Sequence, residues 1–238
     1  MPKKSLSSPP FGKGRGTNHK EFYQYHEPID FRESWRIFKI MAEFVEGYQF
    51  LSQFKNEVTI FGSARTPAAG KYYKMATELG RLLGKNGKTI ITGGGPGIME
   101  AANKGAFEAG AESVGLDMRV DHSERHNKYV RKSMGFFFPF TRKLIISAPS
   151  LAFVVFPGGF GTMHQLFELL TLVQTGKMGK IPVILFGKKF WAPLDKFIRE
   201  VMYKKFKEIS EKDLDLYQIV DTVDEARKII KDRPRTKF

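Results

Sequence analysis

The sequence contains no cysteine, and this absence excludes two classes of protein at once. A chain without thiols forms no disulfide framework and no thiolate metal site, so zinc-finger proteins are excluded. It also lacks an uninterrupted apolar stretch of the roughly 18 residues that a membrane-spanning helix needs, and its N-terminus has no apolar signal region. We therefore expect a cytoplasmic protein that does not enter a membrane.

Acidic residues are scarce, because 25 of them stand against 39 lysines and arginines, which gives a formal net charge of +14. Part of this excess lies in residues 1–20, which carry basic but no acidic side chains. We expect a disordered basic tail over residues 1–26. The excess favours an anionic partner such as a nucleotide. Nucleic acid is not expected to be the main partner, because no recognised nucleic-acid motif accompanies the charge.

The rest of the chain is long enough for one α/β domain. Residues 27–56 are predicted to be an N-terminal helical segment, because large apolar side chains recur there at helical spacing. From residue 57, short apolar strands alternate with amphipathic helices. The strands are expected at 58–61, 89–92, 113–118, 152–156 and 182–186, and the helices from 69, 96, 142, 162, 191 and 222.

This alternation is typical of right-handed βαβ crossovers and a parallel sheet. We therefore predict an α/β fold over residues 57–238, with a Rossmann-like doubly wound parallel sheet and helices on both faces. In such folds the ligand lies at the carboxyl ends of the strands. The loops that follow the predicted strands are consequently the places to look for chemistry.

The most informative loop follows the strand at 152–156, where the segment Pro-Gly-Gly-Phe-Gly-Thr (157–162) leads into a predicted helix. Glycines let backbone N–H groups approach an anion without a Cβ in the way. These glycines are Gly158, Gly159 and Gly161. Thr162 is expected to begin the helix, where its hydroxyl can cap free N–H groups or bind the phosphate that the helix dipole favours. The segment therefore predicts a phosphate site.

Two further loops are expected at the same edge of the sheet. Gly62 and Ser63 follow the first strand, and Arg65 beside them could pair with a phosphate. A plain turn with a surface arginine explains that segment equally well. The segment Gly-Gly-Gly-Pro-Gly (93–97) follows the second strand but lacks the dinucleotide-fingerprint spacing. Two glycine clusters after separate strands favour a paired phosphate site, with predicted contacts at Gly94, Gly95, Gly97 and Met99.

Residues 121–143 are rich in polar and aromatic side chains, and we expect a loop that covers the site. Most of its phenylalanines at 136, 137, 138 and 140 are predicted to pack in the core. Arg142 lies at a predicted helix start, where a cation needs a compensating anion. Asp121, His122 and His126 have loose metal-ligand spacing, but two histidines in a basic loop are more often solvated, so no metal is expected.

The segment 93–100, the pair Arg142-Lys143 and the segment 157–162 together resemble the LOG (Lonely Guy) family, whose members are often labelled lysine decarboxylases. The resemblance covers about residues 58–206 and is strongest to the longer bacterial branch, in which a helical segment precedes the Rossmann core. It implies hydrolysis of the N-glycosidic bond of a nucleoside 5′-monophosphate, of the AMP or cytokinin riboside type, to free base and ribose 5-phosphate. It also implies no cofactor and a homodimer or higher homo-oligomer.

The resemblance further implies residue roles. It gives the phosphate to the loop 158–162, with help from 93–97, and makes Arg142 a catalytic or substrate-orienting cation with Lys143 beside it. It also implies substrate contacts for Thr171 and Glu124. The family motif ends in glutamate, where this chain has Gln165.

Gln165 leaves two functions open. A carboxylate can accept a proton from water and stabilise the positive charge that develops on the ribose, whereas a neutral amide can only hydrogen-bond a ribose hydroxyl. His164 or Glu168 could substitute, so the catalytic candidates are Arg142, Gln165 and Glu168. The alternative is a nucleotide-binding sensor or carrier that has lost hydrolysis, since molybdenum-cofactor carriers have a similar fold. A dinucleotide-dependent oxidoreductase is disfavoured by the glycine spacing.

Overall fold

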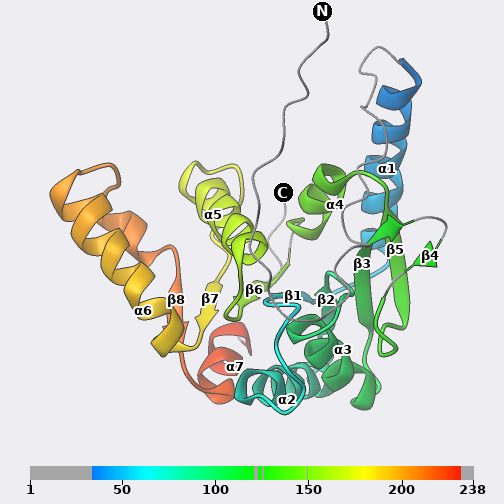
Figure 1. Ribbon diagram of the computed structural model, residues 1–238, viewed down its shortest axis with the longest axis horizontal. Helices are drawn as coiled ribbons and strands as arrows, with labels where there is room; N and C mark the ends of the chain where they lie inside the picture. The colour runs from blue at the N-terminus through cyan, green and yellow to red at the C-terminus, as the bar shows by residue number, and fades with distance from the viewer. Residues whose placement is uncertain (1–33, 121–122, 125, 149, 232–238) are drawn as a thin grey trace, which may run out of the picture.

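The structure is a computed structural model, and it describes residues 34–120, 123–124, 126–148 and 150–231 (Figure 1). The predicted basic tail lies outside these residues, as do Asp121 and His122. Within the described part of the predicted helical segment, one helix forms, α1 (Ser34–Ser52). No described helix is both long enough and apolar enough to cross a membrane.

The sheet contains seven parallel strands within the described residues, in the order β5-β3-β2-β1-β6-β7-β8. A short strand, β4, pairs antiparallel with the end of β3. The strands are β1 (Glu57–Phe61), β2 (Thr89–Thr92), β3 (Ser113–Val120), β4 (Ser123–Glu124), β5 (Lys132–Phe136), β6 (Ala152–Val155), β7 (Val183–Phe186) and β8 (Gln218–Val220). This arrangement confirms the predicted Rossmann-like fold.

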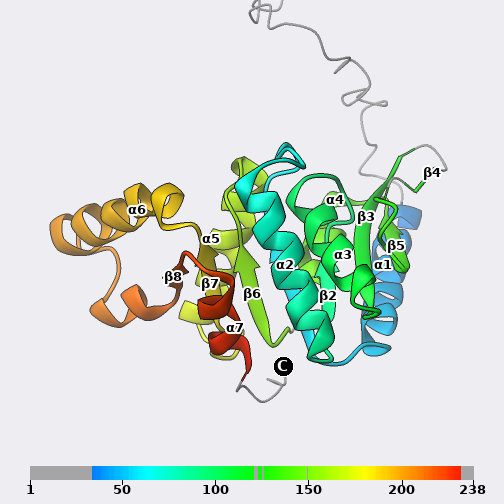
Figure 2. The same cartoon turned by 90° about the horizontal axis from the view of Figure 1, so that it is seen from below.

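Helices cover both faces of the sheet. They are α2 (Lys71–Lys85), α3 (Ile98–Glu108), α4 (Pro139–Ile146), α5 (Phe160–Gln174), α6 (Lys188–Lys196) and α7 (Val223–Lys231). A π-helix, η1 (Phe197–Lys205), continues α6, and a short 3-10 helix, η2 (Glu211–Asp215), precedes β8. Figure 2 shows α2, α3 and α7 lying across the near face.

The central strands are buried on both sides, which explains why they read as continuous apolar runs. Because side chains alternate along a strand, Val58 and Ile60 pack with α2, α3 and α7. Phe61 of β1 and Phe153 of β6 point the other way, into the core beneath α4 and α5, where their rings stack with centroids 6.1 Å apart. Two apolar cores therefore fix β1 and β6 side by side.

The chain changes direction in the sheet between β1 and β6. From β1 it builds outward through β2, β3 and β5, and it then returns to place β6 on the other side of β1, with Val58 opposite Ala152. Loops leaving the carboxyl ends of two such strands diverge and leave a crevice between them. The fold thus places a crevice between the segments that follow Phe61 and Val155.

Several local predictions were wrong. The expected loop over 121–143 contains β5, because Met134 and Phe136 bury their side chains and pair the segment with β3. Of the four phenylalanines expected mostly in the core, two are buried and two are exposed; the exposed ones are Phe137 and Phe140. The helices expected from 142, 162 and 191 begin two or three residues earlier, at 139, 160 and 188, so Arg142 is the fourth residue of its helix and not at its start. Strand β8 was not predicted either, since it has three residues.

Candidate functional site

A pocket of about 700 Å³ lies at the crevice between β1 and β6. The loop after β1 contributes residues 61–65 to its lining, and the start of α5 contributes residues 159–162. Arg142 and Lys143 of α4 line it as well. The pocket therefore combines glycine-containing backbone with three basic side chains, including Arg65.

The structure brings many of the predicted site residues together here. The predicted residues that line the pocket are Gly62, Ser63, Met99, Arg142, Lys143, Gly159, Gly161, Thr162 and Gln165. The predicted residues outside its lining are Gly94, Gly95, Gly97, Gly158, Glu168 and Thr171. Glu124 lies in β4, but its side chain is outside the described part of the chain. Thr171 is exposed on α5 and its hydroxyl donates to the Phe167 carbonyl at 2.7 Å.

The start of α5 is open towards the pocket. The helix has Gly159 as its N-cap, and among the described residues no side chain caps it by a hydrogen bond. The first N–H groups of a helix have no partner within the helix, and they carry the positive end of its dipole. A side chain placed at Gly159 or Gly161 would meet no described atom within 4 Å. This helix start can therefore accept an anion without displacing protein atoms.

Thr162 is the third residue of α5 rather than its cap, which corrects the sequence prediction. Its side chain is buried, and it occupies the space beside Gly158, where an added Cβ would lie 2.1 Å from the Thr162 hydroxyl oxygen. Gly158 is thus required for close packing of the loop against Thr162. Gly159 and Gly161 are the glycines that face open space.

The loop 93–97 is packed differently. An added Cβ at Gly93 would lie 2.3 Å from an Arg142 nitrogen, and one at Gly95 would lie 2.7 Å from the methyl group of Met99. Gly97 has a φ of +70° and sits against the carbonyl of Ser63, 2.3 Å from where its Cβ would be. Close packing therefore accounts for the glycines at 93, 95 and 97, although Gly93 also lines the pocket.

Asn127 fixes the carbonyl groups of the same loop. Its side-chain amide donates to the carbonyls of Gly94 and Gly95 at 3.0 and 3.1 Å and to the Asn103 side chain at 3.0 Å. Its backbone N–H also donates to Gly94 at 2.7 Å. Asn103 is fully buried and accepts a hydrogen bond from Thr92. Sequence reasoning missed this role, because nothing in the pattern around residue 127 shows that it meets residue 94.

Arg142 is held at the pocket wall by backbone carbonyls. Its Nε donates to Leu116 at 2.6 Å and its Nη2 donates to Gly93 at 3.2 Å. Burial lowers the pKa of the guanidinium from its ordinary value, and the nearby Asp117 carboxylate acts in the opposite direction. Asp117 is itself buried and lies 3.4 Å from the Nδ1 of His126. A fixed, partly desolvated cation therefore stands beside the open helix start.

Lys143 connects two side chains of α5. Its Nζ lies 2.7 Å from the Nε2 of His164 and 3.4 Å from a carboxylate oxygen of Glu168. His164 and Gln165 line the pocket, whereas Glu168 does not. Glu168 does not line the pocket, but it forms an ion pair with Lys143, which does.

The fold and the position of this pocket define a Rossmann-like α/β protein with a pocket at the switch point of its sheet, the place where such folds bind ligands. A family model described as "Possible lysine decarboxylase" matches residues 99–230. The chain belongs to this family, which is the LOG family that its motifs resemble. Its place in the longer bacterial branch stays a prediction. Among the described residues, no group of three or more acidic or histidine side chains could hold a metal ion.

Three relatives with assigned activities are 26% to 31% identical to the chain over the residues that align. It is 26% identical to a cytokinin riboside 5′-monophosphate phosphoribohydrolase of Rhodococcoides fascians, over 63% of this chain and 77% of that protein. It is 27% identical to the rice (Oryza sativa subsp. japonica) cytokinin riboside 5′-monophosphate phosphoribohydrolase LOG, over 75% of this chain and 72% of that protein. It is 31% identical to a pyrimidine/purine nucleotide 5′-monophosphate nucleosidase of Escherichia coli, covering 53% and 31%.

Solved structures with the same fold include molybdenum cofactor proteins. The carrier protein of Chlamydomonas reinhardtii aligns with a TM-score of 0.56 and 26% identity, over 74% of this chain and 97% of that protein. The binding protein of Rippkaea orientalis aligns with a TM-score of 0.58 and 20% identity, over 74% and 96%. The second likeness concerns the fold alone.

Proposed function

We propose that this protein binds a nucleoside 5′-monophosphate in the pocket and hydrolyses its N-glycosidic bond, releasing the base and ribose 5-phosphate. One observation carries the proposal: the uncapped start of α5, with Gly159 and Gly161 open to the pocket, lies beside Arg142 and Lys143. Relatives named as nucleotide phosphoribohydrolases and nucleosidases support the same substrate class.

The phosphate fits the start of α5, where unpaired N–H groups and the helix dipole favour negative charge. Arg65 and Lys143 add positive charge along the pocket lining. The ribose then lies towards Arg142, whose guanidinium is fixed by two carbonyls and loses no freedom on binding. The loop 93–97 contributes Gly93 to the pocket lining and accepts a hydrogen bond from Arg142 there, so its part is to hold Arg142.

Hydrolysis needs an acceptor for a proton of the attacking water, and Gln165 cannot be that acceptor. Of the two side chains that could replace the missing carboxylate, His164 lines the pocket and Glu168 does not. Lys143 faces the Nε2 of His164 and also pairs with Glu168. We therefore assign proton acceptance to the Nε2 of His164, which takes the water's proton once the Lys143 ammonium has turned from it to the substrate phosphate. Glu168 pairs with Lys143 and holds that side chain beside the pocket.

Incubation of the protein with AMP tests the proposal, with adenine and ribose 5-phosphate measured by chromatography. We expect turnover that falls by about 10²-fold or more in Arg142→Ala, since removing one fixed charge-stabilising group commonly has an effect of this size. Arg81→Ala is the matched control, because Arg81 pairs with Glu108 on the surface. AMP that is neither bound nor cleaved would overturn the proposal.

A second function, nucleotide binding without hydrolysis, is favoured by Gln165 itself, which lines the pocket where the family motif has glutamate. The likeness to a molybdenum cofactor carrier points in the same direction. If the native chain binds AMP without cleaving it and Gln165→Glu cleaves it, the protein is a sensor or carrier. Cleavage by the native chain supports the enzyme.

We also propose that the protein is a cytoplasmic homodimer or higher homo-oligomer. Exposed apolar side chains flank the pocket on α4 and α5, and such patches commonly mark interaction surfaces. They are Phe140, Leu144, Phe160 and Phe167. Sedimentation of the full chain measures the state, and a monomer at micromolar concentration would contradict this part of the proposal.

A further inference from the structure

The chain entering the helix that carries Arg142 and Lys143 is anchored by a residue from another helix. Glu43 of α1 accepts hydrogen bonds from the backbone N–H groups of Phe137 and Phe138, at 2.5 and 3.3 Å. The same carboxylate accepts a hydrogen bond from the hydroxyl of Thr141, which is fully buried. One side chain of the N-terminal helix thus satisfies three donors at the start of α4.

The start of α4 needs such a partner. Its N-cap is Phe138, whose side chain has no acceptor, and Pro139 follows as the first helical residue. The N–H groups that Glu43 binds belong to the N-cap residue and to the residue before it, so its carboxylate anchors the chain where it enters α4, and the positive end of the helix dipole favours a carboxylate there. Glu43 supplies this carboxylate beside a helix whose first turns also carry Arg142 and Lys143.

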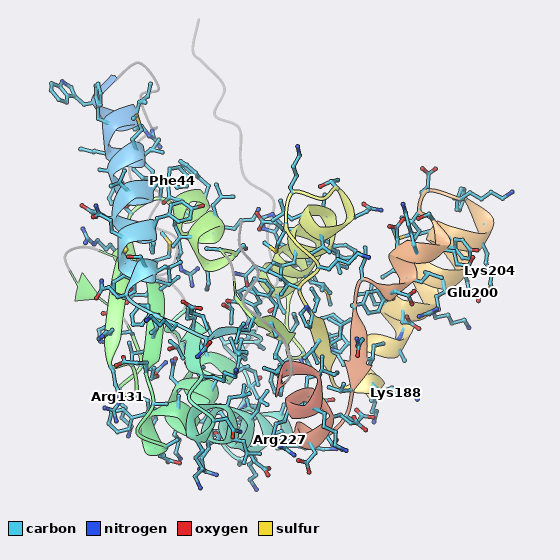
Figure 3. All side chains as sticks on the ribbon, turned by 180° about the vertical axis from the view of Figure 1, so that it is seen from behind. Phe44, Arg131, Lys188, Glu200, Lys204 and Arg227 are labelled. Atoms are coloured by element: carbon cyan, nitrogen blue, oxygen red, sulfur yellow. The ribbon has the colours of Figure 1, made fainter. Side chains whose placement is uncertain are left out.

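Packing holds α1 against the same side of α4. A Cβ added at Gly47 would lie 2.7 Å from Ile145, which is fully buried, so the two helices approach closely there. Phe44 of α1 packs against the core cluster that contains Ile145 (Figure 3). Thr141 and Ile145 therefore face α1, whereas Arg142 and Lys143 line the pocket. The short helix α4 lies between α1 and the site.

We propose that Glu43 is a positioning residue, which acts through α4 to hold Arg142 and Lys143 in the pocket. The N-terminal helix is then part of the machinery of the site and not an appendage to the Rossmann core. The effect on turnover rests on the function proposed above. The effect on the mobility of Arg142 does not, because it exists without any ligand.

The test compares full-length Glu43→Ala and Glu43→Gln with two controls. Glu46→Ala removes an exposed carboxylate from the same helix, and Ile145→Ala weakens the contact between α1 and α4 but leaves the hydrogen bonds of Glu43 in place. Two quantities are measured: the hydrogen-exchange rate of the Arg142 Nε proton by NMR without ligand, and kcat and KM for AMP. Melting temperatures show which variants remain folded.

We expect Glu43→Ala to raise the exchange rate about tenfold and to lower kcat about tenfold with a smaller change in KM, since loss of the anchor loosens the helix that carries the cation. Glu43→Gln keeps one acceptor oxygen and should change both about threefold. Glu46→Ala should match the native protein. If Glu43→Ala does not fold, Glu43→Gln decides the test.

The inference would be overturned if a folded Glu43 variant had the same exchange rate at the Arg142 Nε proton and the same kcat as the native protein. Equal changes in Ile145→Ala at the same melting temperature would also overturn it, because docking of α1 would then explain the effect. A native chain that neither binds nor cleaves AMP, while Glu43→Ala still exchanges faster, would refute the proposed function and leave the positioning role standing.

Discussion

The two glycine loops of this protein look alike in sequence but differ in what surrounds them. The loop 93–97 is covered by Arg142 and Met99 and pressed against Ser63. The loop 158–161 leaves Gly159 and Gly161 open to the pocket at the start of a long helix. Glycine in the first loop serves close packing, and in the second it gives a ligand access to the backbone.

This difference shows that a glycine cluster can serve either close packing or ligand access to the backbone, and the sequence alone does not distinguish the two roles. Both loops follow buried parallel strands and both lead into helices. They are distinguished by what lies above them, and Arg142 belongs to both environments, since it donates to Gly93 and lines the pocket. Substitutions in the two loops should therefore have different consequences.

The largest change is expected for Gly97→Ala. Alanine would hold a strained positive φ, and its Cβ would collide with the Ser63 carbonyl, so the free energy of unfolding should fall by about 3 kcal/mol. Gly110→Ala is the control, because Gly110 has a φ of +74° but no described atom within 4 Å of the added Cβ. It should lose only about 1 kcal/mol. Equal losses in urea unfolding would contradict the packing role of Gly97.

A smaller change is expected for Asn127→Ala, which removes the hydrogen bonds that fix the carbonyls of Gly94 and Gly95. The Gly94 carbonyl keeps its bond from the backbone N–H of residue 127, but the Gly95 carbonyl loses this donor, and the free energy of unfolding should fall by about 2 kcal/mol. Asn86→Ala removes one exposed bond to Leu82 and should change it by less than about 0.5 kcal/mol. Similar urea midpoints for the two variants would argue against a stabilising role for the Asn127 side chain.

The smallest change in stability, with the opposite sign, is expected for Gly161→Ala. Alanine is favoured over glycine within a helix, so the free energy of unfolding should rise by about 0.5 to 1 kcal/mol. The new methyl group narrows the pocket, and the affinity for AMP should fall about fivefold, or about 1 kcal/mol. Calorimetric titration measures it. Unchanged affinity would place the phosphate elsewhere.

Much of the fold could be predicted from the sequence, because the central strands are buried on both faces and read as short apolar runs. The strands at 89–92 and 152–155 lie where the pattern placed them. Strand β5 was missed because Lys132-Ser-Met-Gly-Phe has no clear alternation and is recognised only through its pairing with β3. Strand β8 is too short for any pattern.

The site could be predicted in part. Arg142, Lys143 and the loop after β6 meet in one pocket, as expected from their places after strands of one sheet. Sequence could not show that Met99 and Arg142 cover the other loop, or that Glu43 reaches α4 from a helix about a hundred residues earlier. Such contacts depend on how the helices pack against one another, and local sequence patterns do not predict them.

The pairing of β1 with β6 also bears on how the protein folds. Val58 lies opposite Ala152, so the two strands beneath the pocket join only after the intervening chain has been made and arranged. Closing so long a loop has an entropic cost that local contacts between α2 and α3 avoid. We expect the first half of the sheet to assemble early during synthesis on the ribosome, and the ligand site to be completed among the last steps.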